Sequence, residues 1–178
     1  DPALWYHDGI HFCIENGMMN GVGNNKFDPS GTTSRGMIVT ILYRLENEPE
    51  ITAENPFSDV EDGKWYTDAV AWAAEKGIVQ GYGNGKFGPD DPVIREQIVT
   101  ILYRYAQYKG LDVSAGDTVP LDGYIDVRHI STWALPAFRW AVDAGIINGT
   151  SKDMLSPKKD ASRVEVATML MRYDTKIK

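Results

Sequence analysis

The heptapeptide Ile-Val-Thr-Ile-Leu-Tyr-Arg occupies residues 38–44 of the chain and returns unchanged at residues 98–104. The match extends outward, because residues 5–44 align without a gap on residues 65–104 with 19 identities in 40 positions. Residues 133–172 align on the same segment with 12 identities, so one unit is built three times. All three copies share the residue types of Trp5, Gly17, Gly21, Pro29, Arg35, Thr40, Leu42 and Arg44.

Each copy has the pattern of a helix, a loop and a second helix. In the second copy, Ala69, Val70, Ala73 and Ala74 form an apolar stripe at helical spacing, and Gly77 is placed to end that helix. The second helix is expected to begin at the shared arginine, where residues 162–165 read as a capping box in the third copy. We therefore predict an all-α protein with repeats at residues 1–46, 57–108 and 124–174 that form one compact unit, with linkers over 46–56 and 109–123.

Composition excludes several classes of protein. The 178 residues are 43% hydrophobic and carry a net charge of −7, which disfavours a nucleic-acid partner held by a broad positive field. No apolar run approaches the roughly 18 residues of a membrane-spanning helix, so we expect no membrane insertion. The single cysteine, Cys13, is expected to be a small buried residue, and the histidines lack metal-ligand spacing.

A shared arginine stands at the start of each expected second helix, at Arg35, Arg95 and Arg163. A cation in the first turn opposes the helix dipole, so its recurrence calls for a reason. Free amides at the helix N-terminus together with the guanidinium could bind a carboxylate or a phosphate. Pairing of each arginine with a carboxylate of a neighbouring repeat explains the recurrence equally well.

The tryptophans divide into two groups. Trp72 and Trp140 lie within the expected first helices and are predicted to be core residues. Trp5, Trp65 and Trp133 stand at the helix starts, where a half-exposed ring could stack on a sugar, although core packing is as compatible with the pattern. A further set of shared arginines lies nine residues after the first set, on the opposite helix face, where a structural role at the helix C-terminus is expected: Arg44, Arg104 and Arg172.

The repeats resemble the S-layer homology (SLH) domains of bacterial cell-surface proteins. The second copy matches the family pattern nearly throughout, and the resemblance covers almost the whole chain. The matching motifs are Phe57-Ser58-Asp59-Val60, Trp65-Tyr66, Gly77-Ile78-Val79-Gln80-Gly81, Phe87-Gly88-Pro89 and Ile94-Arg95-Glu96-Gln97.

This resemblance implies a pseudo-threefold unit with a central helical bundle and grooves between the repeats. It implies non-covalent anchoring of an exported, extracellular protein to the bacterial cell wall through secondary cell wall polysaccharide. In well-known members of the family the bound sugar is a terminal pyruvylated N-acetylmannosamine, whose carboxylate suits the arginines. The resemblance implies no catalysis and no cofactor, and a further surface domain fused to this module in the parent protein.

Carried onto this sequence, the family pattern assigns ligand binding to the first-turn arginines, the helix-start tryptophans, two motif aspartates and two loop segments. These residues are Arg35, Arg95, Arg163, Trp5, Trp65, Trp133, Asp59, Asp126, Gly81, Tyr82, Gly83, Gly149, Thr150 and Ser151. The first copy lacks the Phe-x-Asp-Val segment and the third lacks the glycine-rich loop, so we expect Arg95 to be the leading ligand residue and not every groove to be occupied.

Two other classes of function are alternatives to wall binding. A helical-repeat scaffold for protein partners at the cell surface would leave the arginines purely structural, and retention on a protein instead of wall polysaccharide would favour it. A wall hydrolase would need a carboxylate pair, or a nucleophile with its base, and no such set is visible in the sequence.

Overall fold

All regular secondary structure in residues 3–177, the part described by the computed structural model, is helical, which confirms the all-α prediction. The first two repeats contribute two helices each, and the third adds its two helices after a short helix in the second linker. The elements are α1 (His7–Glu15), α2 (Arg35–Leu45), α3 (Thr67–Glu75), α4 (Arg95–Tyr108), α5 (Ala115–Thr118), a 3-10 turn (Val127–His129), α6 (Leu135–Asp143) and α7 (Arg163–Ile177).

The second helix of each repeat begins at the shared arginine, as predicted, but the three starts are capped differently. In α2 the Ser34 hydroxyl accepts a hydrogen bond from the Met37 amide at 3.3 Å. In α7 the expected capping box is present, because Glu165 accepts from the Ser162 amide at 2.8 Å. In α4 the side chain of Gln97 accepts from the Ile94 amide at 3.1 Å.

The first helix of each repeat ends at the predicted glycine. Gly17, Gly77 and Gly145 have φ values of 65°, 70° and 65°, a left-handed conformation that glycine adopts without steric cost. The residue after Gly77 donates its amide back to Ala73 at 2.8 Å, which closes a Schellman motif. These helices start two residues after the shared tryptophan, which therefore lies in the turn before the helix.

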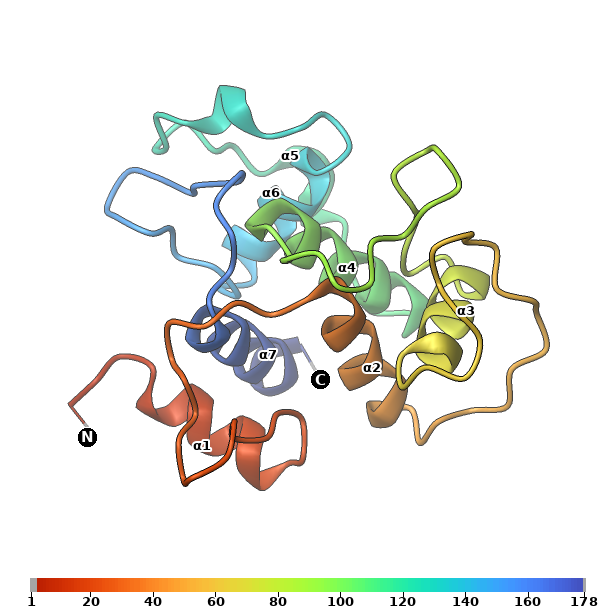
Figure 1. Cartoon of the computed structure of the whole chain (residues 1–178). Coiled ribbons are helices and arrows are strands. Elements are labelled where there is room, and N and C mark those ends of the chain that lie inside the picture. Colours follow the sequence, from red (N-terminus) through yellow and green to blue (C-terminus); the bar gives the residue numbers. More distant parts are fainter. Residues whose placement is uncertain (1–2, 178) are drawn as a thin grey trace.

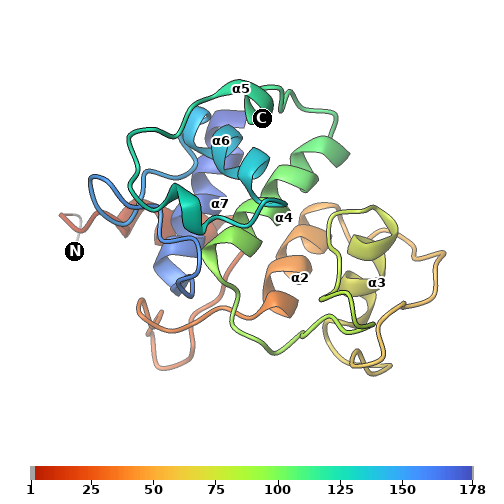
Figure 2. The same ribbon diagram turned by 90° about the horizontal axis from the view of Figure 1, so that it is seen from above.

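The second helices α2, α4 and α7 form the centre of the molecule, and the first helices surround them (Figures 1 and 2). Each first helix packs on the second helix of the preceding repeat: α3 on α2, α6 on α4, and α1 on α7. The packing of α1 on α7 joins the first and last repeats, so the three repeats close into a ring. The two helices of one repeat therefore pack on helices of different neighbouring repeats. Trp72 and Trp140 lie in the core, with exposed fractions of 0% and 2%, as predicted.

The loops that lead into the second helices also join all three repeats. Isolated backbone bridges pair Ser34 with Pro92, Ile94 with Asp160, and Thr32 with Ser162. Each loop therefore touches the loops of both other repeats. This cyclic pairing supports the pseudo-threefold arrangement, which stays a prediction.

Cys13 is buried in the core and its thiol faces the Ala167 carbonyl of α7 at 3.4 Å. Burial raises the pKa of this thiol to about 12, so it is protonated at neutral pH. Its placement confirms the prediction of a small buried residue.

Candidate functional site

Three surface grooves lie between the repeats, and each is built from all three of them. Groove 1 follows the loop of the first repeat, groove 2 that of the second and groove 3 that of the third. Each groove has one wall from the second helix of its own repeat, a tryptophan from the next repeat and a first-turn arginine from the remaining repeat. The tryptophan and arginine are Trp65 and Arg163 in groove 1, Trp133 and Arg35 in groove 2, and Trp5 and Arg95 in groove 3.

The first-turn arginines reach across the boundaries between repeats. Each Nε donates a 2.8 Å hydrogen bond to the backbone carbonyl two residues before the shared proline of another repeat: Arg35 to Phe87, Arg95 to Leu155 and Arg163 to Phe27. The residues that supply these backbone carbonyls differ in burial, because Phe87 and Leu155 are fully buried and Phe27 is partly buried. The arginines thus hold the repeats together with one edge of the guanidinium, while the other edge faces a groove.

The expected free amides at these helix starts are absent in the described residues, and that part of the sequence interpretation was wrong. The amides of Arg35 and Gly36 donate to the carbonyls of Asp91 and Pro89 in the second repeat, at 3.0 and 2.8 Å. The first two amides of α4 and α7 make the same cyclic contacts with the next repeat. An anion bound in a groove therefore cannot be held by the amides of these helix starts.

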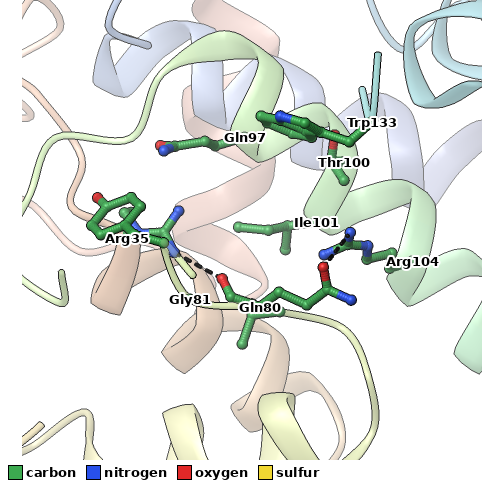
Figure 3. Close-up of a pocket in the computed structure, with 10 residues that line it drawn as sticks. Arg35, Gln80, Gly81, Gln97, Thr100, Ile101, Arg104 and Trp133 are labelled. Atoms are coloured by element: carbon green, nitrogen blue, oxygen red, sulfur yellow. Dashed lines mark hydrogen bonds between the residues drawn. The ribbon is translucent and has the colours of Figure 1, made fainter. Parts of the chain in front are cut away.

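Groove 2 presents two arginines joined through one glutamine (Figure 3). Arg35 donates to the Gln80 backbone carbonyl at 3.3 Å, and Arg104 donates to the Gln80 side-chain oxygen at 3.2 Å. Trp133, with 50% of its surface exposed, lines the same groove. Because Gln80 is neutral, its two hydrogen bonds cancel neither of the positive charges.

Two aromatic rings surround the guanidinium of Arg35. Its guanidinium carbon lies 4.5 Å from the ring centre of Phe87 and 4.7 Å from that of Tyr82, so aromatic faces shield it from water. Burial lowers the pKa of Arg35, and the nearby Tyr82, Asp91 and Asp59 oppose that shift in part. Within residues 3–177 no carboxylate lies within ion-pair distance of its guanidinium.

Groove 3 has the same design, but its first-turn arginine meets a carboxylate. Arg95 lies 3.3 Å from Glu165, which also pairs with Lys159 at 3.2 Å. Burial alone would raise the pKa of Glu165, but the hydrogen bond from the Ser162 amide and the charge of Arg95 outweigh it and hold the pKa below its ordinary value. Glu165 is therefore ionised at neutral pH and forms an ion pair with Arg95.

Groove 1 is the one lined by several methionines. Met18, Met19, Val22 and Met37 line it together with Trp65, which has 54% of its surface exposed. Arg163 donates to the Asn20 carbonyl at 2.7 Å, and its guanidinium carbon lies 4.6 Å from the ring centre of Phe27. The second cation of this groove, Arg44, lies 3.7 Å from Glu48 at the helix end.

Of the residues that the sequence assigned to ligand binding, ten line a groove. They are Arg35, Arg95, Arg163, Trp5, Trp65, Trp133, Gly81, Tyr82, Gly149 and Thr150. Gly83 and Ser151 do not line these grooves, although they follow residues that do.

The two motif aspartates have structural contacts and line none of the three grooves. Asp59 accepts from the amides of Phe87 and Gly88, both at 2.8 Å. Asp126 accepts from the amides of Leu155 and Ser156 at 2.9 and 2.7 Å. Both carboxylates therefore fold the loop of their own repeat, and we do not propose them as ligand residues.

The sequence reasoning missed several residues that line the grooves. The later arginines Arg44, Arg104 and Arg172 each line the groove of their own repeat, as do Thr40, Thr100 and Thr168. The opposite-face geometry was correct, because α4 gives Arg95 to groove 3 and Arg104 to groove 2. Their recurrence in all three repeats was a signal that could have indicated them. It was missed because only the ring shows that each second helix has a groove on both of its sides.

Within residues 3–177, no three side chains of His, Cys, Asp or Glu converge as a metal site. None of the helices there combines the length and apolarity that crossing a bilayer requires.

Comparison with known protein families gives one matching model. The model of the S-layer homology domain matches the chain three times, over residues 1–36, 56–99 and 124–167. The three matches fall one on each repeat.

Individual relatives include both surface proteins and enzymes. An S-layer protein of Bacillus thuringiensis subsp. finitimus is 29% identical over 96% of this chain. An amylopullulanase of Thermoanaerobacterium thermosulfurigenes and an exoglucanase of Acetivibrio thermocellus are 29% and 30% identical, each over 93% of this chain. The chain spans only 20%, 9% and 15% of the lengths of these three relatives.

Proposed function

The chain belongs to the S-layer homology family, and from this membership we propose that it anchors a larger exported protein to the bacterial cell wall by binding secondary cell wall polysaccharide. Its place is the bacterial cell surface, where S-layer proteins reside. The module is a binding unit, and we propose no catalytic role for it. The activities named for its enzyme relatives would belong to other domains fused to such a module.

The observation that carries the proposal is the pair of arginines in groove 2. Arg35 and Arg104 hydrogen-bond two oxygens of the same neutral residue, Gln80, and face an exposed tryptophan from another repeat (Figure 3). A carboxylate between the two guanidinium groups would gain charge-assisted hydrogen bonds, while the apolar face of its sugar would rest on Trp133. A pyruvate ketal places a carboxylate directly on a sugar ring, so a pyruvylated N-acetylmannosamine-type terminal sugar fits this chemistry.

The proposal changes the ranking of the arginines. Arg95 follows the family motif most closely in sequence, but Glu165 already pairs with it. Arg35 carries no such partner within the described residues. We therefore propose Arg35 as the leading ligand residue and groove 2 as the leading groove.

Retention on purified cell-wall sacculi tests the proposal. The unmodified chain should co-sediment with sacculi that carry the polysaccharide and should lose retention after the pyruvyl groups are removed chemically. Arg35→Ala should weaken binding by about 2 kcal/mol, the value expected for a lost hydrogen bond to a charged group. Arg128→Ala is the matched control, because Arg128 is an exposed arginine outside all three grooves.

Since Arg35 also joins two repeats, its removal can lower the stability of the fold. Arg104→Gln is the second variant, because it removes a charge from groove 2 without touching the contact with Phe87. Equal retention of all variants, with the fold intact by circular dichroism, would contradict the proposal. Retention on a protein partner in place of wall polysaccharide would instead favour the scaffold alternative.

A further inference from the structure

Groove 1 exposes apolar side chains at two positions where the other grooves have polar ones. Val22 and Met37 line it, with 57% and 39% of their surface exposed. The equivalent residues are Tyr82 and Gln97 in groove 2, and Thr150 and Glu165 in groove 3. Exposed apolar side chains gathered beside an exposed tryptophan indicate a ligand that carries an apolar group of its own.

The later arginine of groove 1 has an acidic neighbour that its counterparts lack. Arg44 lies 3.7 Å from Glu48, which follows it by four residues. Tyr108 and Lys176 occupy that position in the other repeats, so the later arginines of grooves 2 and 3 have no acid there. Although an exposed ion pair is weak, it lowers the positive charge that groove 1 presents to a ligand.

The other cation of groove 1, Arg163, donates to neutral oxygens. Its Nε and one terminal nitrogen bond the backbone carbonyls of Phe27 and Asn20 at 2.8 and 2.7 Å. A guanidinium carries five N–H groups, so these two contacts leave donors for a further oxygen. Arg163 can therefore donate to the carbonyl oxygen of an uncharged ligand.

The side chain of Asn20 adds an amide to the same groove. Asn20 is exposed, and within residues 3–177 only its backbone carbonyl takes part in a hydrogen bond. The equivalent Gln80 of groove 2 instead gives its side-chain oxygen to Arg104. A side-chain amide has both an acceptor and donors, which match the N–H and the C=O of an acetamido group.

We infer that groove 1 binds an uncharged, N-acetylated sugar of the wall polysaccharide, one that carries no pyruvate ketal. The acetamido group pairs with the side chain of Asn20, its methyl group contacts Val22 and Met37, and the sugar ring stacks on Trp65. Grooves 1 and 2 thus select different sugars of one polymer. This inference rests on the proposed function, which supplies the polymer. Retention on sacculi still depends on the charged contacts of groove 2, because an uncharged sugar alone binds more weakly.

The three grooves can be followed separately by NMR. Each contains one of the three exposed tryptophans, so the indole N–H signal of Trp65 reports groove 1, that of Trp133 groove 2 and that of Trp5 groove 3. Three methyl glycosides are titrated into the 15N-labelled chain: that of N-acetylmannosamine, the same sugar with a pyruvate ketal, and that of mannose, which lacks the acetamido group.

The expected result is a different chemical requirement in grooves 1 and 2. At Trp65, N-acetylmannosamine with and without the ketal should bind within about twofold of each other, and the mannose glycoside about fivefold more weakly or worse. At Trp133 the ketal should improve binding about tenfold or more, because it alone brings a carboxylate to Arg35 and Arg104.

Variants of groove 1 test the named contacts. Asn20→Ala removes the side-chain amide but keeps the carbonyl that Arg163 uses, and should weaken N-acetylmannosamine binding at Trp65 about 5- to 10-fold. Asn148→Ala, the same change in groove 3, is the matched control and should leave Trp65 binding unchanged. Met37→Gln installs the residue of groove 2 and should weaken binding about two- to fourfold, with no loss of melting temperature.

The source of the sugar is tested with the polymers themselves. Released wall polysaccharide from which the pyruvyl groups have been removed should still shift the Trp65 signal and should no longer shift that of Trp133. A Trp65 signal that instead responds only to soluble peptidoglycan fragments would overturn the assignment to the polysaccharide.

Three further results would overturn the inference and leave the proposed function standing. They are equal binding of the mannose glycoside at Trp65, a Trp65 response to the ketal only, and unchanged affinity in Asn20→Ala. Failure of the proposed function looks different, because Trp133 would then ignore the ketal and the chain would not be retained on sacculi.

Discussion

Grooves 2 and 3 share one architecture, and the difference between them that bears on their first-turn arginine lies at one helix position. In both grooves the third residue of the second helix caps its own helix start. Gln97 does so in α4 by accepting from the Ile94 amide, and Glu165 does so in α7 by accepting from the Ser162 amide. The glutamine is neutral and leaves Arg35 without an ionic partner, whereas the glutamate pairs with Arg95.

The total charge of the two grooves does not reveal this difference. The lining of groove 2 has Arg35 and Arg104, a net charge of +2. The lining of groove 3 has Arg95, Arg172 and Lys159 against Glu165, which is 3 − 1 = +2 as well. What differs is the position of the negative charge, which lies against the most buried cation. The residue that caps a second helix therefore also determines whether an arginine of another repeat has an ionic partner.

The largest effect is expected when groove 2 is given the acid of groove 3. Gln97→Glu should pair with Arg35 and weaken anion binding in groove 2 by about 2 kcal/mol, roughly 30-fold. A glutamate in the first turn also suits the helix dipole, so thermal stability should not fall. Titration of the pyruvylated monosaccharide against the Trp133 indole signal measures the effect, and unchanged affinity would show that a carboxylate at this position does not compete.

A smaller and opposite effect is expected in groove 3. Glu165→Gln keeps a side-chain oxygen for the Ser162 amide, so the capping box survives, but it releases Arg95 and Lys159 for a ligand. Binding at the Trp5 signal should tighten by about 1 kcal/mol, roughly fivefold. The melting temperature should fall, because buried Arg95 loses its counter-ion. A groove that binds no better after this change would place the cause of weak binding elsewhere than Glu165.

The smallest effect is the contribution of Glu165 to the pH dependence of stability. Because its pKa is held low in the folded state, Glu165 adds stability above the ordinary glutamate pKa of about 4.3, and this is lost as the pH falls through the folded value. Melting curves between about pH 6 and pH 3 should therefore fall more steeply for the unmodified chain than for Glu165→Gln. Asp59, whose pKa is also lowered by amide hydrogen bonds although burial opposes this, contributes equally to both proteins. Parallel curves would contradict the prediction.

Most of the fold within each repeat could be predicted from the sequence. The starts of α2, α4 and α7, the terminal glycines of the first helices and the buried Trp72 all follow from local rules of helix capping and periodicity. Such rules depend on residues a few positions apart, so they are readable in a linear chain. The short helix α5 was missed, because residues 109–123 carry glycines and a proline that are typical of a linker.

The candidate site was only partly predictable. The sequence indicated Arg35, Arg95 and Arg163 and the three exposed tryptophans, since their repetition is visible. It did not indicate that the amides beside those arginines are taken up by the next repeat, or that Arg104 faces a groove. Those facts depend on which repeats are neighbours in space.

The net charge of −7 also differs from the local charge of the grooves. Composition alone argued against an anionic partner, yet six of the eight arginines occupy repeat positions and all six line the grooves. An acidic surface and local cationic grooves are compatible, because charges at close range outweigh a screened total.

The sequence by itself determined three helical repeats, their boundaries in outline and the residue types that recur at the proposed binding positions. Only the tertiary structure decided that Arg35 shares a groove with Trp133 and that Arg95 shares one with Trp5. It also decided that Glu165 forms an ion pair with Arg95. The physical reason is the closed ring, in which α1 packs on α7. Contacts between repeats are set by burial of apolar surface across that ring, and no local pattern records which repeat will be the neighbour of which.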